Sequence, residues 1–126
     1  MARIRFITKA DDVGSNHAAN MAFHDAYKQG ILRNGVIMMT CAGAAEAAEL
    51  FRGEKGFCMG LHLTLNAEWD RVRWGPVLPP EQVPSLVDEQ GHFFPTTRRL
   101  HDNRPALSEI LAELQAQLDL ARAMRS

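Results

Sequence analysis

Short apolar segments alternate with helical patterns along the first half of the chain, and this alternation restricts the possible folds more than any other feature. The segments that read as buried strands are residues 4–9, 35–40 and 57–65. The segments that read as helices are residues 15–30, with Ser15 or Asn16 as the cap, and residues 44–51. Strands that alternate with helices predict an α/β protein with a parallel sheet, in which all strands end at one edge.

The second half of the chain has a different character. Between Asn66 and Asn103, prolines, a glycine and two tryptophans interrupt the pattern, so we expect a long loop, of a kind that is usually functional. A helix then starts near Pro105, with Asn103 as its candidate cap. We expect its buried face to carry Leu107, Ile110, Leu111, Leu114, Leu118 and Ala121. In an alternating fold this helix leads into another strand, so we expect the chain to be incomplete.

The composition is that of an ordinary soluble domain. Of the 126 residues, 46% are hydrophobic and 23% are charged, which is enough for a single domain over residues 1–126. The formal net charge of -1 argues against nucleic acid or an anionic membrane as a partner. Because there is neither a signal-peptide segment nor an apolar stretch that spans a bilayer, we expect a cytoplasmic protein. Cys41 and Cys58 form no metal-binding pattern, and we expect them to be buried free thiols.

Two carboxylates stand where the first strand should end and the first helix should begin. Residues 10–15 read Ala-Asp-Asp-Val-Gly-Ser. Side chains diverge at a strand end, so Asp11 and Asp12 can take different roles at one reacting centre, one binding a metal and the other handling protons. The alternative is a polar turn in which the aspartates cap the helix.

A histidine stands at the corresponding place in the third strand. His62 lies within residues 60–65, which read Gly-Leu-His-Leu-Thr-Leu, and the parallel order brings it to the same edge as Asp12. The alternative is a core histidine that bonds a backbone carbonyl. A carboxylate and an imidazole at one edge suggest a hydrolase that uses a divalent ion, zinc or magnesium, to activate water. Two ligands are fewer than the three that catalytic zinc usually takes, and no other histidine has ligand-like spacing with His62.

The order of these motifs resembles the YdjC-like carbohydrate deacetylases, the family that includes chitooligosaccharide deacetylase. Residues 83–94 and 113–117 also fit, so the resemblance covers nearly the whole chain. It implies an irregular (β/α) barrel, a divalent ion bound by an aspartate and two histidines, and removal of acetyl from an N-acetylated sugar or chitooligosaccharide. By the same resemblance Asp12 and His62 are metal ligands and Asp11 is the catalytic base. Trp69 and Trp74 could then contact sugar rings, or they could anchor the loop that carries them.

The chain departs from that family in length. Members are substantially longer, and the segment with the third metal ligand follows the helix with which this chain ends. We therefore interpret the chain as the N-terminal half of such a barrel and expect its free strand edges to favour a homo-oligomer. The alternative is a non-catalytic, oligomerising or metal-binding fragment. A phosphatase with Asp11 as nucleophile is disfavoured, because Lys9 alone does not make a phosphate site.

Overall fold

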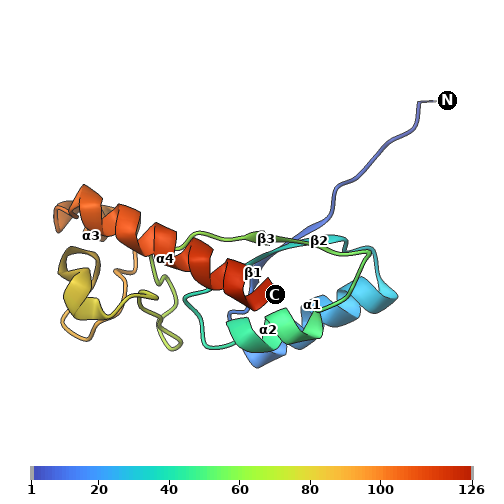
Figure 1. Ribbon diagram of the computed structural model, residues 1–126. Coiled ribbons are helices and arrows are strands. Elements are labelled where there is room, and N and C mark those ends of the chain that lie inside the picture. The colour runs from blue at the N-terminus through green and yellow to red at the C-terminus, as the bar shows by residue number, and fades with distance from the viewer. Residues whose placement is uncertain (1, 126) are drawn as a thin grey trace.

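The computed structural model describes residues 2–125. In the first half strands and helices alternate as β1 (Lys9–Val13), α1 (His17–Gln29), β2 (Asn34–Ile37), α2 (Ala44–Leu50) and β3 (Cys58–Leu61). The second half contains the 3-10 turns η1 (Pro80–Gln82) and η2 (Pro84–Leu86) and the helices α3 (Thr97–Asp102) and α4 (Leu107–Arg125). The predicted alternation of strands and helices is confirmed (Figure 1).

The three strands form one parallel sheet in the order β1-β2-β3. Asn34 of β2 pairs with Lys9 of β1 and with Cys58 of β3, so the strands begin level with one another. Helices α1 and α2 return the chain to the start of each next strand, as parallel pairing requires. The segments that follow β1, β2 and β3 therefore meet at one edge, which we call the carboxyl edge of the sheet.

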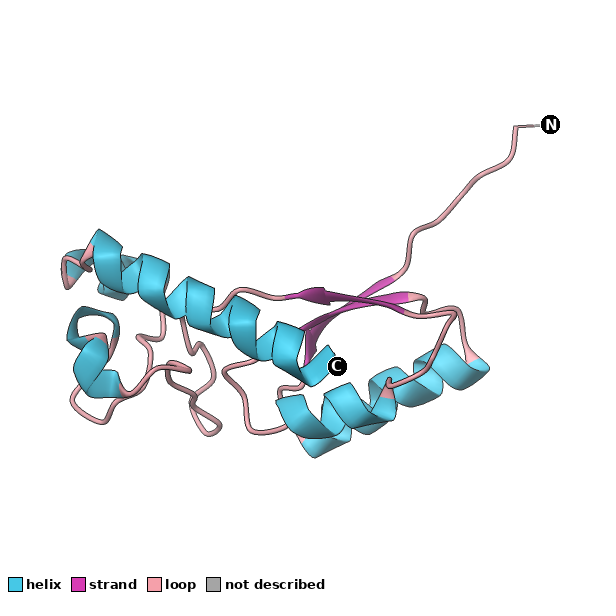
Figure 2. Cartoon of the chain, in the orientation of Figure 1, coloured by secondary structure: helices cyan, strands magenta, loops and turns pink. Residues whose placement is uncertain are grey.

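Helices cover one face of this sheet. Figure 2 shows α1 and α2 together on one side of the strands. Val13 and Ile37 point to that side and are buried in a core that includes Ala47 of α2. The alternate strand residues, such as Asp11 and Cys58, are exposed, as the twofold alternation of strand side chains requires. The sheet is therefore apolar and covered on one face and open on the other.

The predicted first strand is wrong in position. Residues 2–8 form no regular structure, and the segment extends away from the sheet (Figure 1). The strand is Lys9–Val13, so both aspartates lie within it instead of behind it. Ile4, Phe6 and Ile7 are 80%, 84% and 88% exposed. An apolar run indicates burial only where a neighbouring strand exists, and β2 begins at Asn34, opposite Lys9.

The segment between β3 and α4 is more ordered than the sequence suggests. It contains η1, η2 and α3, and Val87 forms an isolated antiparallel bridge with Phe93. It also has its own core, in which Trp74, Leu86 and Phe93 pack around Met38 from the end of β2. Prolines interrupt the sequence pattern in this segment, and 3-10 turns and single bridges are too short to show a repeat. The periodicity of the sequence therefore does not reveal this structure.

Helix α4 buries only part of the predicted face, because Ile110 and Ala121 pack against the two cores while other predicted members are exposed. Leu107 and Leu111 are 71% and 62% exposed, whereas Glu113 and Gln117 are fully buried. Asn103 does not cap this helix; its side-chain amide donates to the Ser85 carbonyl. Within residues 2–125, none of the helices has the length and apolar character needed to cross a bilayer.

Candidate metal site at the carboxyl edge of the sheet

Asp12 departs from regular strand geometry. Its φ of 62° lies in the left-handed region, which aspartate tolerates better than most residues. The register between β1 and β2 shifts between Ala10 and Val13, which is a bulge of the kind that re-aims a side chain. The irregular end of β1 thus directs the Asp12 carboxylate across the end of β2. The N-cap of α1 is Asn16, whose side chain accepts from the Ala19 amide, so neither aspartate caps the helix.

His62 follows β3 directly and faces Asp12. Its amide donates to the Ile37 carbonyl at 2.9 Å, which continues the pairing of β3 with β2 by one residue. Its ring nitrogen Nδ1 lies 3.2 Å from Asp12 Oδ1. The side chains of His62 and Asp12 are 39% and 32% exposed, so the pair is open to solvent on one side. The structure therefore brings together two of the predicted site residues.

The contact between these two residues is close without being a hydrogen bond. Among residues 2–125, His62 Nδ1 is a buried nitrogen without a hydrogen-bond partner, because Asp12 Oδ1 is near but poorly aligned. An unpaired buried nitrogen beside a carboxylate is costly unless a third group binds both. Two ligand atoms that are each about 2.0–2.2 Å from a zinc ion lie roughly 3.3–3.6 Å apart at tetrahedral angles. The observed separation of 3.2 Å is close to this range, so the two atoms are candidates for binding one divalent ion.

The described residues supply no third side-chain ligand. Over residues 2–125, no group of three or more histidine, cysteine, aspartate or glutamate side chains is placed to hold a metal. His17 instead bonds Glu46 through Nδ1 at 2.6 Å. His24 packs edge-on against Phe51, and His101 is exposed.

Asp11 lies beside the pair but engages a different partner. Its carboxylate forms an ion pair with Lys9 Nζ at 2.9 Å, on the open face of the sheet. This hydrogen bond lowers the pKa of Asp11 below its usual value, and the positive charges of Lys9 and His62 act in the same direction. Asp11 is therefore held in the ionised form, which is the form that a general base needs.

Removing the Lys9 ammonium should raise the pKa of Asp11. In Lys9→Met we expect this pKa to move up toward its ordinary value of 3.8, and an NMR titration of the side-chain carboxyl carbon measures it. Because the folded-state pKa is lowered, the ion pair stabilises the folded chain above the ordinary pKa. This contribution is lost as the pH falls through the lowered folded-state pKa. An unchanged pKa in Lys9→Met would show that the ion pair does not form in solution.

The two cysteines differ from each other. Both are free, but Cys41 is buried and Cys58 is exposed, so the prediction of burial is confirmed only for Cys41. Burial raises the pKa of the Cys41 thiol to about 11, and the nearby Asp12 carboxylate adds to this shift. Since a metal ligand must be the thiolate, Cys41 is a poor ligand near neutral pH.

This difference predicts the order in which the cysteines react. At pH 7.5 we expect iodoacetamide to modify Cys58 in the folded chain while Cys41 remains unmodified, because burial and the raised pKa both suppress its thiolate. Mass spectrometry of tryptic peptides measures both sites, and the chain unfolded in urea is the control in which both react. Equal modification of the two cysteines in the folded chain would contradict the burial of Cys41.

Trp74 anchors the loop that carries it. It is 5% exposed, and its Nε1 donates to the Asn66 carbonyl at 2.7 Å. Trp69 packs against it edge-on with ring centroids 5.5 Å apart. Of the two roles that the sequence leaves open for the tryptophans, the structure supports loop anchoring for Trp74.

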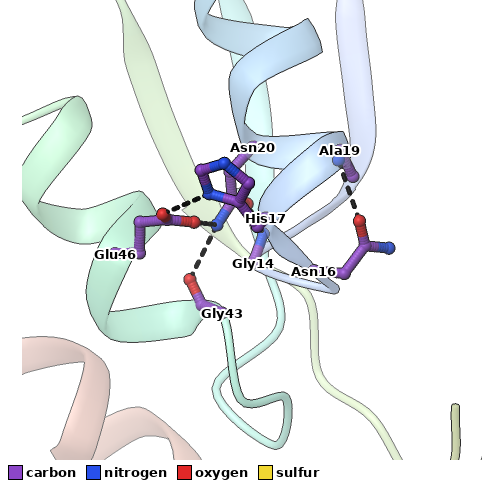
Figure 3. A network of polar contacts seen from close by, with 7 residues as sticks. All are labelled: Gly14, Asn16, His17, Ala19, Asn20, Gly43 and Glu46. Atoms are coloured by element: carbon purple, nitrogen blue, oxygen red, sulfur yellow. Dashed lines mark hydrogen bonds and ion pairs between the residues drawn. The ribbon is translucent and has the colours of Figure 1, made fainter.

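A buried asparagine ties the turn after Asp12 to neighbouring segments (Figure 3). Asn20 is the buried residue of α1 and is fully shielded from solvent. Its Oδ1 accepts from the Gly14 amide at 2.8 Å. Its Nδ2 donates to the Gly43 carbonyl at 2.9 Å and to Glu46 Oε2 at 2.8 Å. One side chain therefore links the loops that follow β1 and β2 at the carboxyl edge.

A second polar cluster holds the segment after His62. The Gln117 side chain accepts from the Thr64 amide at 2.9 Å and donates to the Thr64 carbonyl at 2.7 Å. Glu113 accepts from the amides of Val77 and Leu78, and from Gln117 at 2.8 Å. The spacing of four residues places Glu113 and Gln117 on one face of α4. Periodicity of apolar residues could not reveal this cluster, because its members are polar.

The fold and this pair of residues define an α/β protein with a candidate metal site at the carboxyl edge of a parallel sheet. The chain belongs to the YdjC-like protein family, whose model matches residues 5–126. The carbohydrate deacetylase of Enterococcus faecalis is 32% identical over 119 residues, which cover 94% of this chain and 43% of that protein. The chitooligosaccharide deacetylase of Yersinia enterocolitica is 32% identical and covers 90% of this chain and 42% of that protein.

A solved structure agrees with this family assignment. The crystal structure of an Enterococcus faecalis protein described as a cellobiose-phosphate cleavage protein matches with a TM-score of 0.82 at 30% identity. The match covers 95% of this chain and 44% of that chain. The chain thus spans less than half the length of these relatives.

Proposed function

We propose that this chain is part of a metal-dependent carbohydrate deacetylase, a hydrolase that removes acetyl groups from N-acetylated sugars such as chitooligosaccharides. The observation that carries the proposal is the 3.2 Å separation of Asp12 Oδ1 and His62 Nδ1 at the carboxyl edge. Membership of the YdjC-like family and the deacetylase names of the relatives support the substrate class.

Each of the three residues has a distinct role in this proposal. Asp12 and His62 would hold a divalent ion, and a mixed nitrogen and oxygen set favours zinc over magnesium. Such an ion would supply Lewis-acid chemistry toward the acetamide carbonyl and would lower the pKa of water to about 7. Asp11 accepts the proton of the attacking water, for which its lowered pKa keeps it ionised.

The wider architecture is part of the proposal. We place the single domain 1–126 in an irregular (β/α) barrel, whose remaining part supplies the third ligand. In the described residues the outer edges of β1 and β3 pair with no further strand, and one sheet face is uncovered. Both features suit a sheet that continues around a barrel, where the uncovered face lines the interior. The coverage of 44% of the solved relative supports the same interpretation.

Release of acetate from a short N-acetylglucosamine oligomer tests the proposal. If the 126-residue chain completes the site with added zinc, for example across an oligomer, it releases acetate, and Asp11→Asn binds zinc without turnover, because the amide cannot accept the proton. No release from the unaltered chain would mean that the remaining part of the barrel is required for activity. Acetate release that Asp11→Asn leaves unchanged would contradict the assignment of the base.

The second candidate function is a non-catalytic, metal-binding and oligomerising fragment. It is favoured by the two-residue ligand set, by the exposed Ile4, Phe6 and Ile7 in the segment before β1, and by the free edges of the sheet. Such surfaces promote pairing between copies of a chain. Zinc binding without acetate release, together with a dimer in size-exclusion chromatography, would support this candidate over the enzyme.

A further inference from the structure

Two buried side-chain amides occupy equivalent places behind the two proposed metal ligands. Asn20 bonds the backbone of Gly14, which lies two residues after Asp12. Gln117 bonds the backbone of Thr64, which lies two residues after His62. Each amide comes from a helix packed beside the sheet, and each is 0% exposed. The same arrangement thus occurs at both ends of the pair.

We infer that Asn20 and Gln117 are paired positioning residues that together set the separation of Asp12 and His62 and therefore the affinity for the divalent ion. This inference rests on the proposed function of the Asp12 and His62 pair as metal ligands. Neither amide touches a ligand side chain in the contacts described, so each acts through the backbone.

The need for such support follows from the geometry of the ligands. β1 and β3 are not neighbours in the sheet, so no ladder of hydrogen bonds connects Asp12 to His62 directly. Asp12 also lies within the register shift between Ala10 and Val13, at a φ of 62°. A residue in this region persists only where its surroundings hold it there. The hydrogen bond from the Gly14 amide to Asn20 supplies this restraint on the Asp12 side of the pair.

On the His62 side of the pair, the Gln117 side chain makes the hydrogen bonds that a neighbouring strand would make. Its amide group offers Thr64 one acceptor and one donor, which is the pattern that the backbone of a paired strand would offer. The ladder between β2 and β3 ends with the bond from the His62 amide to Ile37. Gln117 therefore provides the next hydrogen bonds, two residues later at Thr64, and prevents the strand from fraying at His62.

Close packing makes the position of the first turn sensitive to Asn20. A Cβ atom on Gly43 would lie 2.7 Å from the Gly14 carbonyl and 3.0 Å from Asn20 Nδ2. The loops after β1 and β2 are thus in direct backbone contact around the asparagine. Loss of the amide would leave the Gly14 amide and the Gly43 carbonyl without this partner and allow the two loops to separate.

The test measures zinc affinity and amide hydrogen exchange in Asn20→Leu, Gln117→Met and the double variant. Both replacements keep the side-chain size and remove the hydrogen bonds. Outer partners of metal ligands typically change affinity about 10–100-fold, and we expect each single variant to raise the Kd for zinc about tenfold. Both residues set the same separation between Asp12 and His62. The Kd of the double variant for zinc should therefore be only slightly higher than that of the single variant with the higher Kd.

A control separates positioning from general stability. Phe51→Leu alters the core beneath α2 and contacts neither ligand turn. It should lower the melting temperature while the folded chain keeps its zinc affinity. In Asn20→Asp combined with Glu46→Gln, the Gly14 amide keeps its acceptor but the Gly43 carbonyl loses its donor, so we expect a smaller loss of zinc affinity than in Asn20→Leu.

Exchange of two specific amides provides a readout that needs no metal. The Ser15 amide donates to the Asp12 carbonyl, and the His62 amide donates to Ile37. Faster exchange of Ser15 in Asn20→Leu and of His62 in Gln117→Met, but not in Phe51→Leu, would support the inference. Unchanged exchange at both amides, or an unchanged Kd in the folded variants, would overturn it. If the unaltered chain binds no zinc, the ligand assignment fails for this chain, and with it the part of the inference that concerns affinity. The exchange rates then decide only whether the two amides position the turns.

Discussion

Replacing Glu113 with alanine lowers the free energy of unfolding by about 3–5 kcal/mol, because several buried polar groups lose their partner at once. The carboxylate accepts from the amides of Val77 and Leu78 and from the side chain of Gln117. Glu113 is fully buried, so water does not take its place without reorganisation of the loop. Since a domain is stable by only about 5–15 kcal/mol, this loss is a large fraction of the total.

Urea denaturation of Glu113→Ala measures this loss. Gln115→Ala is the matched control, because Gln115 lies on the exposed face of the same helix and bonds only Asp119 among the contacts described. It should change the free energy of unfolding by less than about 0.5 kcal/mol. Equal effects of the two substitutions would show that the buried cluster does not hold the loop to α4.

Replacing Asp12 or His62 with alanine weakens zinc binding at least about 100-fold, a larger effect than the loss of an outer partner causes. Each substitution removes one of the two atoms that lie 3.2 Å apart, and the described residues offer no replacement ligand. Isothermal titration of the 126-residue chain with zinc measures the affinity. Unchanged zinc binding in both variants would disprove the ligand assignment.

Asp11→Asn is the control for this pair of substitutions. Asp11 pairs with Lys9 and is exposed, so its replacement should leave zinc affinity unchanged. A loss of zinc in Asp11→Asn as large as in Asp12→Ala would instead assign Asp11 to the ligand set. The three variants therefore distinguish the ligands from the proposed base.

The order of elements was predictable because it depends on local patterns. Apolar segments, an asparagine cap at Asn16 and the alternation of strands with helices sufficed to predict the parallel sheet. The position of β1 was not predictable, because Ile4, Phe6 and Ile7 have the character of a buried strand yet lie before the point where β2 begins. Burial of a strand depends on its neighbours as well as on its own residues.

The residues of the candidate site were predictable from the sequence, but their geometry was not. Parallel topology places Asp12 and His62 at one edge, and the structure brings them together. The bulge that directs Asp12 across β2 has no sequence signal beyond the tolerance of aspartate for positive φ. The burial of Glu113 and Gln117 was not predictable, because patterns of apolar residues cannot identify buried polar groups whose partners are distant backbone atoms.

A crystal structure of the chain with zinc, with anomalous data collected at the zinc edge, would show whether Asp12 and His62 bind the ion. We predict one anomalous peak about 2.0–2.2 Å from both Asp12 Oδ1 and His62 Nδ1. It also predicts that this peak disappears in crystals of His62→Ala. A zinc peak held by other residues, with Asp12 and His62 still in contact and free of metal, would contradict the claim that this pair is the metal site.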